Sequence, residues 1–302
     1  MTILILGGAD DEHAMHVLTQ LRALGHDAEL LDSRDFPERL TIAYDPTSNK
    51  GELRLPAGRR LELWQIHSVY WRCYHGPGAV TLPDAAQAHL AANDARSLFE
   101  SLLINLPAKW VNGWNAYRLH QTKPAQLAKV AALGIPVPAT LLGNDPAAVR
   151  AFAARYPRSV FKPVQGGAHT SRLEPRHLSD ANLRNLVHAP VTIQEEVSGT
   201  DVRVFIAGEH VLACEVRTDA VDFRDDPNPT IMECALPPEV AGWCVRAARA
   251  LELVWTGIDL RRTPEGRYVF LEANPSPMFL GFELRSALPL TERLVELLVQ
   301  SR

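Results

Sequence analysis

The amino-acid sequence predicts a chain of mixed α/β and α+β class, with a Rossmann-like N-terminal domain, a small central domain and a C-terminal domain built on an antiparallel sheet. Three observations support this prediction. The chain opens with a strand–helix–strand pattern, its middle part consists of short elements broken by Pro and Gly, and strand-like runs dominate from Val191 onward. The predicted domain boundaries are therefore residues 1–115, 116–190 and 191–302.

The N-terminal domain is predicted to begin with a buried parallel strand at Thr2–Leu6, an uninterrupted apolar run. A helix should follow, because apolar residues recur at helical spacing from Val17 to Leu24, and Gly25 stands where a helix ends. Ala28–Leu31 is the next predicted parallel strand. The turn after the first strand reads GGADD and lacks the G-x-G-x-x-G fingerprint, which argues against a dinucleotide site there.

The rest of this domain is predicted from apolar spacing. Leucines between Leu53 and Leu63 in turn-rich sequence indicate a hairpin. Ser68–Tyr74 is predicted to form a further strand. A long helix ended by Pro107 should bury one face, which carries four leucines: Leu90, Leu98, Leu102 and Leu106.

The two later domains follow from the same signals. In the central domain we expect a helix from Thr122 to Gly134, an extended or edge segment, a helix from Asp145 to Tyr156, and a strand at Val160–Pro163. The C-terminal domain should contain strands at 191–197, 202–207, 210–216, 255–260 and 268–273, with helices near 239–251 and 289–299.

The overall composition is that of an ordinary globular protein. Of 302 residues, 46% are hydrophobic and 22% are charged, and the formal net charge is −4. Because nucleic acids and membrane surfaces favour a basic face, this balance argues against both and favours a small-molecule partner. The four cysteines show no CxxC spacing, and no apolar run approaches the roughly 20 residues of a membrane-spanning helix. Since the chain also opens on a strand-like run without a signal peptide, we expect a cytoplasmic protein with reduced thiols.

The most informative segment is the strand that ends at Asn274. Glu272 and Asn274 lie two apart and therefore point to the same face of the strand. Asp259 lies on the preceding strand, where an antiparallel hairpin would bring it opposite Glu272. Two carboxylates and a carboxamide oxygen are typical ligands of a Mg²⁺ ion shared with nucleotide phosphates. Taken singly, each residue is better explained as a polar side chain at the end of a hairpin.

Lysines carry unusual weight because arginine supplies nearly all of the positive charge. Only five of the 31 basic residues are lysines. Lys123 stands at a predicted helix start, and Lys162 stands just before a small-residue loop that contains Gly166 and Gly167. An ammonium group beside mobile backbone amides suits a phosphate, although this loop lacks the Walker pattern and could be a simple turn.

An acid-rich joint follows the first strand of the C-terminal domain. Glu195, Glu196 and Val197 end that strand, and Asp201 follows shortly after. The joint could be a solvated linker, or it could be a hinge that accepts the amino group of an adenine while Asp201 binds a ribose hydroxyl.

These motifs keep the order found in ATP-grasp ligases, and nearly the whole chain resembles that superfamily. Residues 201–208 and Glu272–Pro277 are similar to RimK-type glutamate ligases. Six other short motifs resemble microviridin-type peptide-cyclising ligases: Asp11–His13, Asp35–Pro37, Tyr70–Arg72, Trp110–Asn112, Gln126–Leu127 and Asp222–Arg224. His169, Met278 and Phe279 match no position of the family pattern.

The resemblance implies the ATP-grasp fold, in which a pre-grasp domain precedes a small lid and a C-terminal domain, with ATP between the last two. It implies that Lys123, Lys162, Gly166 and Gly167 contact phosphates, that Glu195, Glu196 and Val197 contact adenine, and that Asp201 contacts ribose. Asp259, Glu272 and Asn274 would hold two Mg²⁺ ions, with Mn²⁺ as an alternative, and Arg203 and Arg224 would act on the transferred phosphate.

The implied activity is an ATP-dependent ligase that activates a carboxylate as an acyl phosphate for attack by an amine or hydroxyl. The substrate would be a peptide or an amino acid, held by loops such as 72–82 and 276–286. His169 is a candidate base, although an ordinary surface or core histidine is the more common case and is favoured here. The alternative is an ATP-binding regulatory or scaffold protein without turnover. A homodimer is one assembly that the sequence leaves open.

Overall fold

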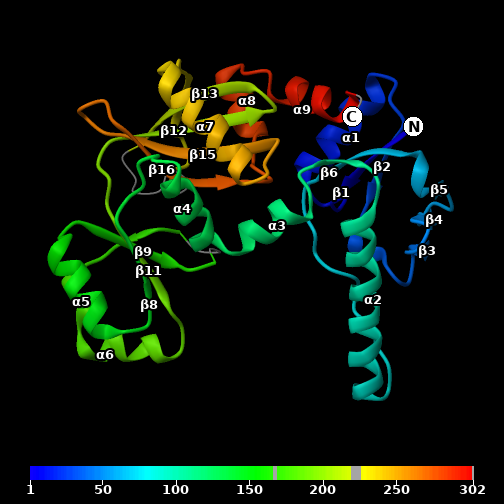
Figure 1. Ribbon diagram of the computed structural model, residues 1–302, viewed down its shortest axis with the longest axis horizontal. Coiled ribbons are helices and arrows are strands. Elements are labelled where there is room, and N and C mark those ends of the chain that lie inside the picture. The colour runs from blue at the N-terminus through cyan, green and yellow to red at the C-terminus, as the bar shows by residue number, and fades with distance from the viewer. Residues whose placement is uncertain (166–168, 219–225, 301–302) are drawn as a thin grey trace. The chain divides into compact units, whose positions relative to one another are not determined.

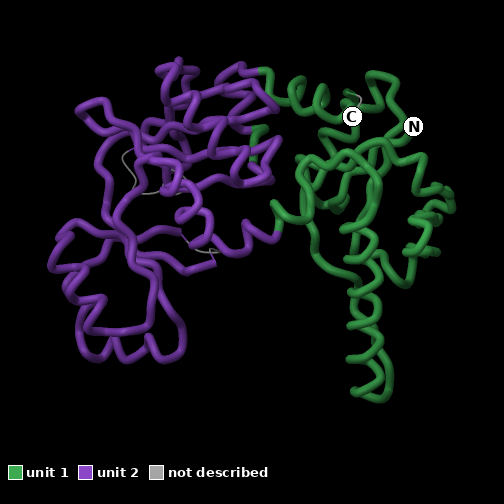
Figure 2. Tube along the Cα trace, viewed as in Figure 1, with its two compact units in different colours: residues 1–117, 278–280, 289–302 green, residues 118–277, 281–288 purple. Residues whose placement is uncertain are grey.

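The computed structural model describes residues 1–165, 169–218 and 226–300. The chain forms two compact units, which are coloured separately in Figure 2. The first unit contains residues 1–117, 278–280 and 289–302, and the second contains residues 118–277 and 281–288. The chain therefore leaves the first unit, builds most of the second, passes through the first at residues 278–280, and returns to it for good at residue 289. The further division of the second unit into a lid and a C-terminal domain stays a prediction.

The first unit is built on a four-stranded parallel sheet in the order β2-β1-β6-β7 (Figure 1). Its strands are β1 (Thr2–Leu6), β2 (Ala28–Leu31), β6 (Ile66–Trp71) and β7 (Lys109–Val111). The predicted Rossmann-like opening is confirmed: β1 is buried along its whole length, and α1 (Glu12–Ala23) joins it to β2. Gly25 has a φ of 82°, the left-handed conformation expected after a helix end.

The last helix of the chain packs on the first elements. Helix α9 (Leu290–Val299) contacts α1, β6 and β7. The hydroxyl of Ser68 donates to the carbonyl oxygen of Leu298 at 2.7 Å, and the Nε2 atom of His16 lies 3.0 Å from the hydroxyl of Thr291. The C-terminal helix is thus part of the core of the first unit.

The predicted hairpin between Leu53 and Leu63 is confirmed: β4 (Lys50–Arg54) pairs with β5 (Arg60–Glu62), and β3 (Thr41–Asp45) adds a third antiparallel strand. Another prediction in this unit needs correction. In α2 (Ala85–Asn105), Leu90 is 61% exposed, because the first half of the helix extends past the core. Phe99 and Leu102 fill the core from the second half.

The second unit holds two antiparallel sheets. The smaller has the order β10-β9-β11-β8, with α5 (Pro146–Arg155) beside it and α6 (Asp180–Leu183) nearby. Its strands are β8 (Thr140–Gly143), β9 (Ser159–Pro163), β10 (Ser171–Arg172) and β11 (Val191–Glu195). The larger has the order β14-β13-β12-β15-β16 and is contacted by α7 (Pro238–Ala250). Its strands are β12 (Thr200–Ala207), β13 (His210–Arg217), β14 (Thr230–Glu233), β15 (Trp255–Arg262) and β16 (Tyr268–Asn274).

Three helices complete the fold. Helix α3 (Trp114–Gln121) runs across the boundary between the units, and α8 (Leu280–Ser286) begins at the point where the chain leaves the first unit again. Helix α4 (Lys123–Ala132) falls within the predicted lid range. It nevertheless contacts β16 of the larger sheet and α7, the helix that packs on that sheet. Thr122 stands at the N-cap of α4, but its side chain makes no capping hydrogen bond. None of the described helices is both long and apolar enough to cross a membrane.

Candidate functional site

One face of the larger sheet gathers polar and charged side chains from three of its five strands, β12, β15 and β16. Asp259 pairs directly with Glu272 across the β15–β16 ladder, as the hairpin prediction required. On the other side of Asp259, Arg203 is its partner on β12, and the Arg203 Nη1 atom donates to Asp259 Oδ1 at 2.5 Å. The amide nitrogen of Asn274 lies 3.2 Å from Glu272 Oε1 and 3.5 Å from Asp259 Oδ2. The two carboxylates and the amide therefore form one cluster.

Two lysines add positive charge to this cluster. Lys123, the first residue of α4, donates from Nζ to Glu272 Oε2 at 2.9 Å, and both side chains are 26% exposed. Burial favours the neutral form of Glu272, but the charges of Lys123 and Lys162 outweigh it and hold the pKa of Glu272 well below its usual value. Glu272 is thus a carboxylate at neutral pH, as a metal ligand must be.

A buried amide that the sequence analysis did not select as a site residue holds the end of β16 in place. The Nε2 atom of Gln126 donates to the carbonyl oxygen of Ala273 at 2.8 Å, and the backbone N–H of Ala273 donates to Gln126 Oε1, also at 2.8 Å. Ala273 lies between Glu272 and Asn274. In addition, the hydroxyl of Thr256 donates to the carbonyl oxygen of Asn274 at 2.8 Å. The sequence signals were a polar residue on the face of α4 that also carries Val130 and the resemblance of Gln126–Leu127 to a motif of peptide-cyclising ligases.

Arg203 is fixed more tightly than an ordinary arginine. Its side chain is 7% exposed, and its guanidinium lies over the rings of Phe205 and Phe282, with Cζ 5.3 and 5.6 Å from their centroids. A Cβ atom at Gly257 would lie 2.5 Å from Arg203 Nη2 and 2.6 Å from Cζ. Gly257 therefore leaves the space that the guanidinium fills.

The residues proposed for adenine and ribose lie at strand ends in the second unit. Asp201 points to the same face of β12 as Arg203 and forms an ion pair with Arg261 at 2.7 Å. Glu195 ends β11, and its backbone N–H donates to the carbonyl oxygen of Ala139 at 2.9 Å.

The next two residues complete this joint. The Glu196 carboxylate accepts from the Arg172 guanidinium at 3.0 and 3.1 Å, and Val197 follows it without regular structure. The contacts recorded for Glu195 and Glu196 do not reach the cluster around Glu272. Their roles at an adenine stay predictions.

Three predicted site residues lie outside the described residues: Gly166, Gly167 and Arg224. His169 is described and is exposed to solvent. A shallow hollow of about 360 Å³ lies beside Phe161 on the smaller sheet. Because neighbouring residues of a strand point to opposite faces, this hollow lies on the other side of β9 from Lys162.

The donor set suits a hard cation bound together with phosphates. Within the described part of the chain, no group of three or more His, Cys, Asp or Glu side chains could hold a metal ion without help. Asp259 and Glu272 supply carboxylate oxygens, and a half-turn of the Asn274 amide would supply a third oxygen in place of its nitrogen. Phosphate oxygens would complete the shell, and Lys123 and Lys162 would neutralise their charge.

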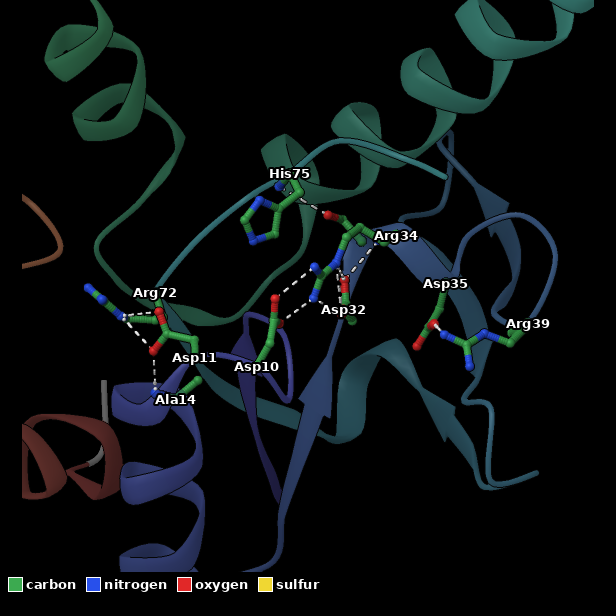
Figure 3. Close-up of polar contacts among 10 residues, drawn as sticks. Asp10, Asp11, Ala14, Asp32, Arg34, Asp35, Arg39, Arg72 and His75 are labelled. Atoms are coloured by element: carbon green, nitrogen blue, oxygen red, sulfur yellow. Dashed lines mark hydrogen bonds and ion pairs between the residues drawn. The ribbon is translucent and has the colours of Figure 1, made fainter. Parts of the chain in front are cut away.

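A second polar cluster lies in the first unit, at the edge where its parallel strands end (Figure 3). Arg34, after β2, donates to both oxygens of Asp10 and to both oxygens of Asp32. Its hydrogen bond to Asp10 lowers the pKa of that carboxyl to about 2. Arg72, after β6, donates from Nε to both oxygens of Asp11 at 3.0 Å. Ligands of open parallel sheets generally bind at this edge.

Comparison with known proteins identifies the family to which this architecture belongs. Residues 123–298 match the family described as the RimK-like ATP-grasp domain. A probable alpha-L-glutamate ligase of Xanthomonas campestris pv. campestris is 32% identical over 166 residues, which cover 51% of this chain and 57% of that protein. The chain thus matches less than two thirds of the length of this curated relative.

Two solved structures align over all or nearly all of the chain. One is the ATP-grasp ligase PsnB with a phosphomimetic variant of a minimal precursor, Mg and ADP, which is 33% identical with a TM-score of 0.84, covering 98% of this chain and 97% of that one. The other is the macrocyclase MdnC bound to the precursor peptide MdnA from Microcystis aeruginosa MRC, at 25% identity, a TM-score of 0.86 and 100% coverage of both chains.

These likenesses confirm the predicted ATP-grasp fold and the predicted resemblance to both RimK-type and peptide-modifying ligases. Because the family match extends over more than half of the chain, this protein belongs to the RimK-like ATP-grasp family.

Proposed function

We propose that this protein is an ATP-dependent ligase that joins a carboxylate of a peptide to an amine or a hydroxyl and releases ADP and phosphate. The observation that carries the proposal is the cluster in which Asp259, Glu272 and Asn274 meet within hydrogen-bond range while Lys123 and Lys162 place positive charge on Glu272. A peptide is favoured over a free amino acid because MdnC, which aligns over the whole chain, is bound to the precursor peptide MdnA, and PsnB, which aligns over 98% of it, is in complex with a minimal precursor.

In the proposed reaction a substrate carboxylate oxygen attacks the terminal phosphorus of ATP, and the bond to ADP breaks. The amine or hydroxyl then attacks the acyl carbon, phosphate leaves with the bonding electrons, and the nucleophile loses its proton. Magnesium would supply charge neutralisation for the phosphates. The residues of this chain bind and orient: Lys123 and Lys162 would hold phosphates, and Arg203 would face the phosphoryl group in transfer.

Arg203 suits that task because its position is set before any ligand arrives. A guanidinium held by Asp259, by two aromatic rings and by the space over Gly257 loses little freedom when charge develops beside it. Arg224, Gly166 and Gly167 keep the phosphate-side roles proposed from the sequence.

The test is release of ADP with candidate peptides, combined with the mass of the product, which should equal the mass of the joined reactants less one water for each bond formed. Glu272→Ala should abolish magnesium-dependent turnover, because the phosphate charge is then poorly neutralised. Glu209→Ala is the matched control, since Glu209 forms an exposed ion pair with Arg249 in the same unit.

A regulatory or scaffold protein would bind ATP and release no ADP with any peptide or amino acid, and that result would overturn the proposal. Turnover with free amino acids alone would leave the ligase chemistry in place and exclude the peptide substrate. Full activity of Glu272→Ala would remove the metal assignment.

A further inference from the structure

Phe279 and His13, which lie far apart in the sequence, meet in the first unit. The ring of Phe279 lies 4.9 Å from that of His13 at 55° and 6.3 Å from that of His16 at 69°. Phe279 is fully buried, and His13 is 2% exposed. Neither ring nitrogen of His13 has a hydrogen-bond partner. The contact is thus an aromatic one inside a closed core, on the first turn of α1.

Hydrogen bonds and an ion pair hold the first turn of α1, which carries His13, in place. Asp11 caps the helix by accepting from the backbone N–H of Ala14 at 2.8 Å, and the same carboxylate accepts from Arg72 (Figure 3). Arg72 directly follows β6 of the parallel sheet in the first unit. The helix start that carries His13 is therefore tied to the sheet by a capping bond and an ion pair.

Phe279 belongs to a short stretch of chain with unusual connections. We call residues 275–282 the linking segment; it follows Asn274 of the proposed metal cluster directly. Within it, residues 278–280 cluster with the first unit, whereas 275–277 and the residues after 280 cluster with the second. Phe282, at its far end, packs edge-on against Phe205 at 5.5 Å and lies over the guanidinium of Arg203.

The two aromatic residues therefore hold the same segment at different places. Phe282 covers Arg203 in the second unit, and Phe279 is buried in the first unit three residues earlier. Asn274 does not depend on this segment, because Thr256 fixes its backbone and Gln126 fixes its neighbour Ala273. A disturbance at Phe279 should then reach the linking segment and Arg203 and leave the carboxylate cluster in place.

We infer that Phe279 is a positioning residue, which through its burial against His13 sets the path of the linking segment and hence the place of Phe282 over Arg203. The inference rests on the proposed ligase function. A small displacement of a positioned group far from the reacting atoms can lower a rate by up to about a hundredfold. The effect should appear in kcat and in the KM of the peptide rather than in the binding of nucleotide.

The test compares Phe279→Leu with Phe99→Leu, because both phenylalanines are fully buried in the first unit and Phe99 lies outside the linking segment. We expect kcat/KM for the peptide to fall about tenfold in Phe279→Leu, with KM for ATP within about twofold of wild type. Phe99→Leu should lose a similar amount of thermal stability and keep its turnover. Equal turnover in the two variants, or a KM for ATP that rises as much as kcat falls, would overturn the inference.

Hydrogen exchange gives a readout that needs no activity. In Phe279→Leu, exchange should speed up in α8, at residues 280–286, and stay unchanged in β16, at residues 268–274. If the wild-type protein released no ADP with any substrate, the proposed function would fail while this measurement still decided the positional role. Unchanged exchange in α8 would show that Phe279 does not set the linking segment.

Discussion

Gln126 binds both backbone groups of Ala273, donating to its carbonyl oxygen and accepting from its amide, each at 2.8 Å. A helix side chain thus takes the place of a further strand at the edge of the larger sheet, where β16 would otherwise present an unpaired ladder. Glu272 and Asn274, on either side of Ala273, receive their geometry from this pair of hydrogen bonds.

Gln126→Leu should therefore lower both stability and metal affinity. Leucine has a similar volume but leaves a buried N–H and C=O without partners, a loss of about 1–3 kcal/mol for each buried group. We expect a lower Tm and a higher magnesium concentration at half-maximal ADP release. Gln87→Leu, on the exposed start of α2, controls for the added apolar residue. A magnesium titration identical to wild type would show that the hydrogen bonds of Gln126 do not position the cluster.

Gly257→Ala should displace Arg203. The new Cβ would lie 2.5–2.8 Å from the nitrogen and carbon atoms of the guanidinium, so the side chain must leave its place over Phe205 and Phe282. We expect kcat to fall at least about tenfold, with a smaller change in KM for ATP, because a preorganised cation acts chiefly in the transition state.

The matched control is Gly242→Ala in α7, where the nearest atom to a new Cβ is Arg246 Nη1 at 3.7 Å. Alanine in a helix interior stabilises by roughly 0.5–1 kcal/mol relative to glycine, so this variant should keep full turnover and gain stability. If Gly257→Ala kept the kcat of this control, the position of Arg203 would not matter for the reaction.

Lys162→Ala should raise the KM for ATP about tenfold and lower kcat as well, since an ammonium group beside phosphates contributes to both the ground state and the transition state. Lys129→Ala, on the exposed last turn of α4, removes the same charge elsewhere in the second unit. Initial rates over a range of ATP concentrations measure both constants. An ATP dependence equal to that of the Lys129 variant would exclude Lys162 from the nucleotide site.

His13 should make the first unit sensitive to mild acid. Burial lowers the pKa of His13, and the nearby charge of Arg72 lowers it further, against the opposing charges of Asp11 and Glu12. The unfolded chain takes up a proton near the ordinary value of 6.5, before the folded protein does. Stability contributed by this group is therefore fully present above about pH 6.5 and is lost as the pH falls toward the lower folded value.

Urea unfolding at several pH values between 5 and 8 measures this effect. The difference in unfolding free energy between wild type and His13→Leu should change with pH in that window, whereas His89→Leu, on the exposed start of α2, should run parallel to wild type. Parallel curves for His13→Leu would show that the imidazole is reached by water or by a proton acceptor in the folded state.

Sequence reasoning succeeded where a short-range rule sets the geometry. Asp259 could be placed near Glu272 because the short turn at Thr263–Gly266 joins their strands into an antiparallel hairpin. A one-residue register shift between Asp259 and Leu260 then sets Asp259 opposite Glu272 rather than Leu271. The N-terminal strand–helix–strand pattern was equally readable, since a continuous apolar run and helical spacing have distinct periods.

It failed where the partner is distant along the chain. Nothing in the spacing of α4 shows that Gln126 reaches Ala273, and no local pattern shows that Phe279 enters the core of the first unit. Leu90 was placed in the core because periodicity identifies a helix face and not the length over which that face is covered. The exposure of Leu90 depends on where the neighbouring elements end.

The return of α9 to the first unit has a consequence for synthesis of the chain. The parallel sheet of the first unit leaves the ribosome before the second unit, yet α9, which packs on α1, β6 and β7, is made after the second unit. Until it emerges, the hydroxyl of Ser68 lacks its partner carbonyl at Leu298, and the apolar face that α9 covers stays open to solvent. The parallel sheet of the first unit therefore lacks its α9 packing partner for as long as the second unit is being translated. Loss of α9 would therefore damage α1, β6 and β7, which precede the whole second unit in sequence.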